Sequence, residues 1–304
     1  MIPQLEIFKS ECDRNLIGKH EQFNLVLANF LAGGNTLIED VPGVGKTTLV
    51  KVFSQVFNFN LSRIQFTNDL LPSDILGTSI YIQSTNKFEF HKGPIFGDII
   101  MADELNRAPP KTQSALLQAM EERAITIDGR TYELPEHFHI IATQNPHSQV
   151  GTYDLPESQV DRFSLKISLG HADKTSTLRM LQSKTLNSDI VIKQTIEHDW
   201  VVKTKNLIND IIVSDSIYEY VYRLLEYSRM NCDFPLSNRA GIDLIKIAKA
   251  YAYLRSDNAV LSNDIKYLFP FVAGHRLVTP SDSDINLEKK HATKILQDVT
   301  IRDL

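Results

Sequence analysis

A lysine and a threonine at the end of a glycine-rich loop are the residues with the clearest chemical meaning. Two apolar, β-prone residues (Leu37 and Ile38) lead into a loop that ends in Gly45, Lys46 and Thr47, and a helix-like segment follows. This order is typical of a phosphate-binding loop, in which backbone N–H groups and a helix N-terminus face the phosphates. Lys46 would then contact the β- and γ-phosphates, and the Thr47 hydroxyl would ligate Mg²⁺.

We expect nucleotide contacts along the whole loop and in the first turn of the helix. The residues concerned are consecutive: Val41, Pro42, Gly43, Val44, Gly45, Lys46, Thr47 and Thr48. The motif has a glycine five residues before Gly45, and this chain has Asp40 there. Since Gly-Lys-Thr is common by chance, a nucleotide site requires a second group of residues.

Two adjacent carboxylates supply that second group. Asp103 and Glu104 directly follow the apolar run 99–102, which predicts a buried strand. Ligand sites of open α/β sheets lie at the carboxyl ends of their strands, so both carboxylates would stand at that edge. Asp103 can hold Mg²⁺, and Glu104 can orient and polarise the attacking water. Without the loop, the same run would also fit a buried strand that ends in a solvated acidic pair.

Three further polar residues are candidates for the same reaction. Asn145 ends another apolar run, where its amide could bind the γ-phosphate or the lytic water, although Asn-Pro also favours a turn. Arg162 precedes the last strand-like run, and Arg239 opens a helix-like run. An arginine at the γ-phosphate accelerates phosphoryl transfer by about 10³–10⁵. Arg162 could serve a neighbour's nucleotide and Arg239 could contact the nucleotide from the second domain, but for each a surface ion pair is the commoner role.

The elements that position these residues change character near residue 170. Before it, apolar runs predict strands buried on both faces of a parallel sheet, and Gln22–Leu31 predicts a helix. The predicted strands are Thr36–Ile38, Leu61–Phe66, Asp98–Ala102, Phe138–Thr143 and Ser164–Ser168. Asp69–Pro94, with alternating runs at Ser79–Ile82 and Lys87–His91, predicts an inserted hairpin, and insertions of this size are usually functional.

The second half predicts an all-helical domain. Helical periodicity covers Thr175–Thr185, Val201–Ile212, Ser216–Met230, Arg239–Leu254 and Ser262–Val278. Ser237 and Ser262 are expected N-caps, and residues 282–304 show no periodicity that predicts an element. We expect two domains, 1–170 and 171–304.

The composition restricts the class of protein. A net charge of −5 and a pI near 6 argue against a protein that mainly holds nucleic acid. No run of about 18 apolar residues predicts a membrane span, and the first residues do not read as a signal peptide. Two distant cysteines, Cys12 and Cys232, fit a reducing cytoplasm, and the histidines show no ligand spacing.

Together these residues resemble the MoxR family of AAA+ ATPases over about residues 17–170, and more weakly beyond. The strings that carry the resemblance are RIQFT (63–67), LPSDI (71–75), GPIF (93–96), ADELNRAPPKTQ (102–113), ATQNP (142–146), GTY (151–153), LPE (155–157) and DRF (161–163). The implied fold is a five-stranded parallel α/β AAA+ domain followed by an all-helical lid. Residues 69–94 match the family's helix-2 insert, a contact for substrate.

The resemblance also implies roles for individual residues. It places Walker A at Gly43, Gly45, Lys46 and Thr47, Walker B at Asp103 and Glu104, sensor 1 at Asn145, an arginine finger at Arg162 and a sensor 2 arginine at Arg239. Arg107 and Arg123 match family positions near the subunit edge without a defined role. The carboxylate of Asp40, where the family has glycine, would lie near bound phosphates; if it repels them, Asp40→Gly tightens ATP binding.

The implied function is that of a Mg²⁺-dependent, chaperone-like ATPase in the cytoplasm. The resemblance implies ATP and Mg²⁺ as cofactors, a ring that is usually a hexamer, and a partner with a von Willebrand factor A domain. The client protein is not implied, and neither nucleic acid nor membrane insertion is expected. Two alternatives stay open: a nucleotide switch that does not hydrolyse ATP, and the motor subunit of a metal chelatase or a nucleic-acid machine.

Overall fold

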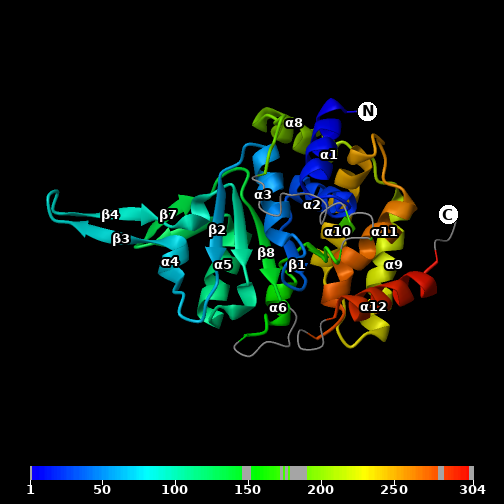
Figure 1. Cartoon of the computed structure of the whole chain (residues 1–304). Coiled ribbons are helices and arrows are strands. Elements are labelled where there is room, and N and C mark those ends of the chain that lie inside the picture. Colours follow the sequence, from blue (N-terminus) through cyan, green and yellow to red (C-terminus); the bar gives the residue numbers. More distant parts are fainter. Residues whose placement is uncertain are drawn as a thin grey trace.

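The computed structural model describes residues 2–145, 152–171, 174, 177–178, 190–279 and 284–300. Within them an α/β part stands beside a helical part, and a long hairpin projects from the far side of the α/β part (Figure 1). Most of the helix expected over Thr175–Thr185 lies outside the described residues. Pro146 and Gly151, which belong to two of the family-like sequence strings, also lie outside them. Among the residues described, no helix is long and apolar enough to cross a membrane.

The centre of the α/β part is the predicted parallel sheet. Its five strands run in the order β2-β5-β8-β1-β9, and every neighbouring pair is parallel. The strands are β1 Thr36–Glu39, β2 Leu61–Gln65, β5 Ile99–Asp103, β8 His139–Gln144 and β9 Leu165–Ile167. All five predicted strands are therefore confirmed, with no end shifted by more than one residue.

Alternate residues of the central strands enter two different hydrophobic cores. Ile38, Met101 and Ile141 pack into one core, while Leu37 and Ile140 pack into the other. Successive side chains of a strand point to opposite faces, so a strand covered on both faces must be apolar throughout. The continuous apolar runs in the sequence have this cause.

Helices cover both faces of the sheet. The first core is built with α1, α2 and α3, whereas α5 contributes Leu116 and Leu117 to the second. The predicted helix at Gln22–Leu31 is α2, and α1 was not predicted. The bounds are α1 Pro3–Asn15, α2 His20–Leu31, α3 Lys46–Val56, α5 Pro110–Glu122 and α6 Glu157–Val160, with a 3₁₀ turn η2 at Leu105–Arg107.

Two antiparallel hairpins extend from the α/β part. The predicted insert, Asp69–Pro94, contains α4 Pro72–Leu76, β3 Gly77–Ile82 and β4 Lys87–Lys92, and the 3₁₀ turn η1 Pro94–Phe96 begins at its last residue. A second hairpin, β6 Ala124–Ile127 with β7 Arg130–Glu133, was not predicted. The rings of Phe90 and Tyr132 stack 4.3 Å apart and join the two hairpins.

The helical part contains four of the predicted helical segments. They are α8 His198–Asn209, α9 Asp215–Asn231, α10 Asn238–Leu254 and α11 Ser262–Ala273, followed by the 3₁₀ turn η3 Gly274–Arg276. The Ser237 hydroxyl caps α10 by accepting a hydrogen bond from Ala240 N, as predicted. Ser262 as N-cap is wrong: it is the first helical residue, and Asp264 instead accepts from Leu261 N at 2.8 Å.

A final helix, α12 Ile285–Asp298, lies where no element was predicted. Its buried stripe consists of Glu288, Ala292 and Ile295 and continues to Val299. A glutamate therefore occupies a core-facing position, which obscures the apolar periodicity. This carboxylate is tolerated because Lys166, itself buried on β9, lies 2.5 Å from it.

The buried His139 predicts a loss of stability in mild acid. Burial lowers its pKa to about 3, and its ring Nδ1 bonds Gly34 O. Below pH ~6.5 the unfolded chain binds a proton that the folded chain does not, so stability falls by up to about 1.4 kcal/mol per pH unit from this residue. We expect urea midpoints to fall from pH 7 to pH 5, and to fall less in His139→Asn.

The exposed His91 provides the matched control. His91→Gln should keep the wild-type pH dependence. An unchanged dependence in His139→Asn would contradict the assignment.

Candidate functional site

Three of the predicted site residues meet at the carboxyl edge of the sheet. Lys46 Nζ donates to Asn145 Oδ1 at 3.0 Å, and Asn145 Nδ2 donates to Glu104 Oε1 at 3.0 Å. The parallel register brings them together, since β1, β5 and β8 are neighbours and each residue follows the end of one of them. The Asn145 amide therefore bridges the loop lysine and the carboxylate, one group through its oxygen and the other through its nitrogen.

The loop between β1 and α3 has the backbone of a phosphate cradle. Gly43 and Gly45 have φ of +86° and +101°, a region that side chains rarely adopt. A Cβ on Gly45 would also lie 2.9 Å from Leu16 Cδ1. α3 begins at Lys46, directly after this glycine, so its unpaired N–H groups open onto the loop.

Lys46 is oriented before any ligand arrives. Besides its bond to Asn145, its Nζ donates to the backbone oxygen of Asp40 at 2.6 Å. Burial lowers the pKa of Lys46, and the negative charges of Asp40, Asp103 and Glu104 oppose that shift. The ammonium group is thus partly dehydrated and surrounded by acceptors, which suits an anionic ligand.

Asp103 is the last residue of β5 and has partners on both oxygens. Thr143 Oγ1 donates to Oδ1 at 2.7 Å, and Arg63 NH2 lies 2.6 Å from Oδ2. Arg63 and Thr143 were not assigned roles from the sequence. Thr143 lies near the carboxyl end of β8 and Arg63 lies in the middle of β2, and these two strands flank β5.

Glu104 stands just beyond the strand in a left-handed backbone conformation, with φ 58°. Its N–H donates to Thr143 Oγ1, and its Oε2 accepts from Gln65 Nε2 and Arg107 NH1, each at 2.9 Å. Positive φ at a non-glycine residue persists only where the surroundings enforce it, and such residues cluster at functional sites. Arg107 thus contacts Glu104, the residue predicted to orient the attacking water, and Gln65 is a further partner that the sequence did not reveal.

The residues present fit a magnesium ion. Mg²⁺ prefers oxygen ligands and is usually bound by one or two protein groups together with phosphates. Thr47, the second residue of α3, and Asp103, the last residue of β5, carry such oxygens at the carboxyl edge of the sheet. Within the described ranges, no group of three or more His, Cys, Asp or Glu residues forms a protein-only metal site.

Asp40 does not present an unpaired carboxylate to the loop. Its Oδ2 accepts from Ser168 Oγ at 2.8 Å and from Gly170 N at 2.7 Å, and its Oδ1 accepts from Val41 N at 3.0 Å. The side chain is only 8% exposed. It is therefore engaged with the segment that follows β9.

The two predicted arginines lie at the opposite edge of the sheet. Arg162 precedes β9, which is parallel to β1, so it stands at the amino edge, whereas Lys46 follows the carboxyl end of β1. Arg162 and Arg239 each contact the carboxylate of Glu121, at 3.1 and 2.5 Å. The structure does not bring either arginine to the Lys46 site of its own chain, which corrects the expectation for Arg239.

Arg123, which like Arg107 had no predicted role, donates hydrogen bonds to backbone oxygens at this amino edge. Its NH2 donates to Gly33 O at 3.0 Å and its NH1 to Phe138 O at 3.4 Å. It therefore fixes the starts of β1 and β8 to the end of α5.

Comparison with known proteins agrees with this geometry. Residues 35–165 match the family described as "ATPase family associated with various cellular activities (AAA)", and residues 233–299 match the AAA lid domain. The chain is 42% identical to the uncharacterised protein YeaC of Bacillus subtilis, over 88% of this chain and 84% of that one. It is 36% identical to chaperone MoxR1 of Mycobacterium tuberculosis, over 90% and 75%. A solved structure of a presumed ATPase from Cytophaga hutchinsonii matches with a TM-score of 0.88 and 35% identity, covering 99% of this chain and 96% of that one.

Proposed function

This chain belongs to the MoxR family of AAA+ ATPases, and on that basis we propose that it hydrolyses Mg-ATP to remodel a partner protein. The observation that supports hydrolysis is the bonded series Lys46, Asn145 and Glu104 at the carboxyl edge of the sheet. Lys46 would bind the β- and γ-phosphates, and Thr47 and Asp103 would hold the Mg²⁺ that neutralises them. Glu104 would orient the attacking water, and Asn145, which bonds both Lys46 and Glu104, would lie between Glu104 and the γ-phosphate.

Assembly into a ring is proposed from the position of the arginines. Arg162 and Arg239 lie side by side on Glu121, at the edge of the sheet away from their own loop. In a head-to-tail ring one subunit's amino edge can face the next subunit's carboxyl edge. Both arginines would then act on a neighbour's γ-phosphate, and a hexamer is the ring size we propose.

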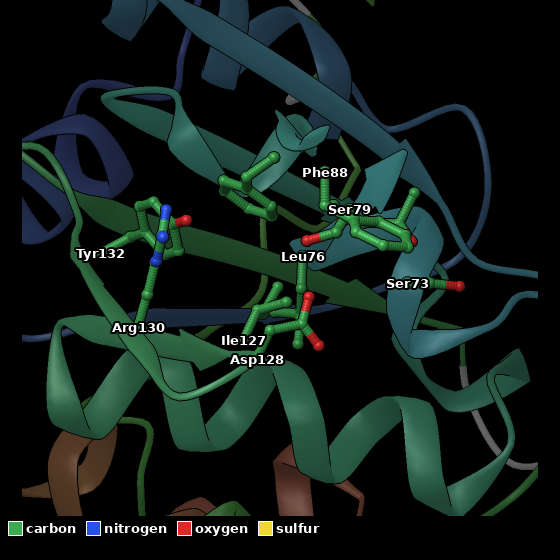
Figure 2. A pocket seen from close by; sticks show the side chains of 11 residues that line it. Ser73, Leu76, Ser79, Phe88, Ile127, Asp128, Arg130 and Tyr132 are labelled. Carbon is green, nitrogen blue, oxygen red and sulfur yellow. The ribbon is translucent and has the colours of Figure 1, made fainter. Parts of the chain in front are cut away.

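The partner-binding surface is proposed to lie between the two hairpins. A cavity of about 690 Å³ is lined by both hairpins and by α4, and Figure 2 shows side chains of both hairpins around it. Phe88 on β4 is 72% exposed and its ring lies 5.3 Å from that of Tyr81, which is 48% exposed, so this hairpin presents an apolar patch of the kind that marks interaction sites. Aromatic and polar groups together suit an unfolded or extended stretch of a client protein. A von Willebrand factor A domain protein as partner, and a cytoplasmic location, belong to the same proposal.

Replacing Glu104, which is predicted to orient and polarise the attacking water, should separate ATP binding from turnover. Glu104→Gln keeps the hydrogen bonds that the carboxamide can make but cannot polarise the water, so we expect Mg-ATP binding within a few-fold of wild type and a loss of about 10²-fold or more in kcat. Phosphate release and equilibrium nucleotide binding measure the two quantities. Hydrolysis equal to wild type in Glu104→Gln would exclude the role; negligible turnover in the wild type itself would favour the non-hydrolysing switch.

Mixing two inactive variants tests action in trans. Lys46→Ala and Arg162→Ala subunits should each be inactive alone, because one lacks the loop lysine and the other the arginine. In random mixed rings about a quarter of the interfaces combine an intact loop with an intact arginine, so activity should return to roughly that fraction. The same is expected for Arg239→Ala. Mixed rings without any recovery, verified by mass, would contradict the proposal.

Capture of a client tests the surface between the hairpins. Glu104→Gln with Mg-ATP should retain client protein because the ATP state persists. Adding Phe88→Ser should release it by removing an exposed ring, while Tyr222→Ser, a matched exposed aromatic on α9, should not. Retention that is insensitive to Phe88→Ser would argue against this surface.

A further inference from the structure

Asp40 joins the phosphate loop to the connection between the sheet and the helical part. We call residues 168–171, which directly follow β9, the exit segment. The Asp40 carboxylate accepts from Ser168 Oγ at 2.8 Å and from Gly170 N at 2.7 Å. Hydrogen bonds to an ionised carboxylate are stronger than those between neutral groups. The bonds therefore fix the first residue beyond β1 to the exit segment.

The exit segment is itself held from the other side. Lys19, only 4% exposed, donates from its Nζ to the backbone oxygens of Leu169, Gly170 and His171 at 2.5, 3.1 and 3.1 Å. Gly170 has φ +62°, which lets the chain turn so that its N–H faces Asp40 while its carbonyl faces Lys19. Asp40 is thus bonded to a segment whose position is already determined.

The loop needs such an anchor because its middle is exposed and rich in glycine. α3 fixes its far end, and Asp40 fixes its near end. Asp40 also accepts from Lys46 Nζ through its backbone oxygen at 2.6 Å, so its position sets the direction of the loop lysine. A loop that is ordered before the ligand arrives loses less conformational entropy on binding.

Glu39, the residue before Asp40, makes a similar contact with β9, the strand that precedes the exit segment. Glu39 Oε2 lies 2.8 Å from Lys166 Nζ, and Lys166 also pairs with Glu288 of α12. Two consecutive acidic residues, Glu39 and Asp40, therefore contact Lys166 on β9 and Ser168 in the exit segment, respectively. Through Lys166 the helical part is connected to the residue that precedes Asp40.

We propose that Asp40 is a positioning residue that holds the phosphate loop against the exit segment and so raises nucleotide affinity. The proposal rests on nucleotide binding at Lys46, the proposed function. The change in nucleotide affinity expected on removing the Asp40 carboxylate is then opposite to the change that like-charge repulsion would predict. If the carboxylate repelled phosphates, its removal would tighten binding; if it positions the loop, its removal weakens binding.

The test measures Mg-ADP binding to the full chain by calorimetry, together with KM and kcat for ATP. Asp40→Gly should raise the dissociation constant about tenfold, equivalent to ~1.4 kcal/mol. KM should rise in parallel while kcat at saturation stays within about threefold, because the loop would bind ground state and transition state less well to the same extent. A purely structural role would lower the melting temperature without moving the dissociation constant.

Ser168→Ala removes one partner and leaves the loop sequence unchanged. It should weaken Mg-ADP binding about threefold, and the double variant with Asp40→Gly should bind no more weakly than Asp40→Gly alone, since the two side chains act through one contact. If Asp40→Gly does not fold, Asp40→Asn and Ser168→Ala carry the same test. Asp210→Gly, an exposed carboxylate at the end of α8, is the matched control and should bind as wild type.

The outcomes are distinct. Unchanged or tighter binding in the Asp40 and Ser168 variants, with Lys46→Ala weakened, overturns the proposal and leaves the nucleotide site intact. Wild-type protein that binds no Mg-ADP, or Lys46→Ala that binds as wild type, overturns the proposed function itself.

Discussion

The ammonium group of Lys166 connects the three parts of the molecule on which the site depends. It is 3% exposed and lies 2.8 Å from Glu39 Oε2, on β1, and 2.5 Å from Glu288 Oε1, on α12. Gln144, at the end of β8, donates to the same Glu39 carboxylate. Removing one partner of a buried ion pair typically costs about 3–5 kcal/mol, because the remaining charge stays desolvated. The end of β1, the end of β8 and the helical part are therefore fixed relative to one another.

The position of this cluster matters because the candidate site begins one residue beyond the ends of β1 and β8. Glu39 is followed by Asp40 and the phosphate loop, and Gln144 is followed by Asn145. The bond between Lys46 and Asn145 thus joins the phosphate loop to the end of β8, next to the buried ion pair that Glu39 makes with Lys166. A shift of the helical part that disturbed Glu288 would reach the loop through two contacts, without any change in the residues proposed to bind phosphate.

The two edges of the sheet carry different candidate residues of the proposed nucleotide site. The carboxyl edge is assembled within one chain, since β1, β5 and β8 are neighbours and end together. The amino edge carries Arg162 and Arg239, whose guanidinium groups share the Glu121 carboxylate at the end of α5. A single parallel sheet cannot bring both edges to one ligand, which is the geometric reason for proposing a ring.

The sequence by itself determined the parallel sheet, its five strands, the loop and the catalytic candidates at the strand ends. These follow from local pattern: apolar runs that must be buried on both faces, and polar residues where such runs stop. Local pattern failed where a distant partner decides the outcome. α12 was not recognisable because Glu288 is buried against Lys166, and the hairpin at Asp128-Gly129 was overlooked despite a turn signal. Only the tertiary structure decided that Asp40 faces the exit segment and that Arg239 lies beside Arg162, because both depend on which strands and helices become neighbours.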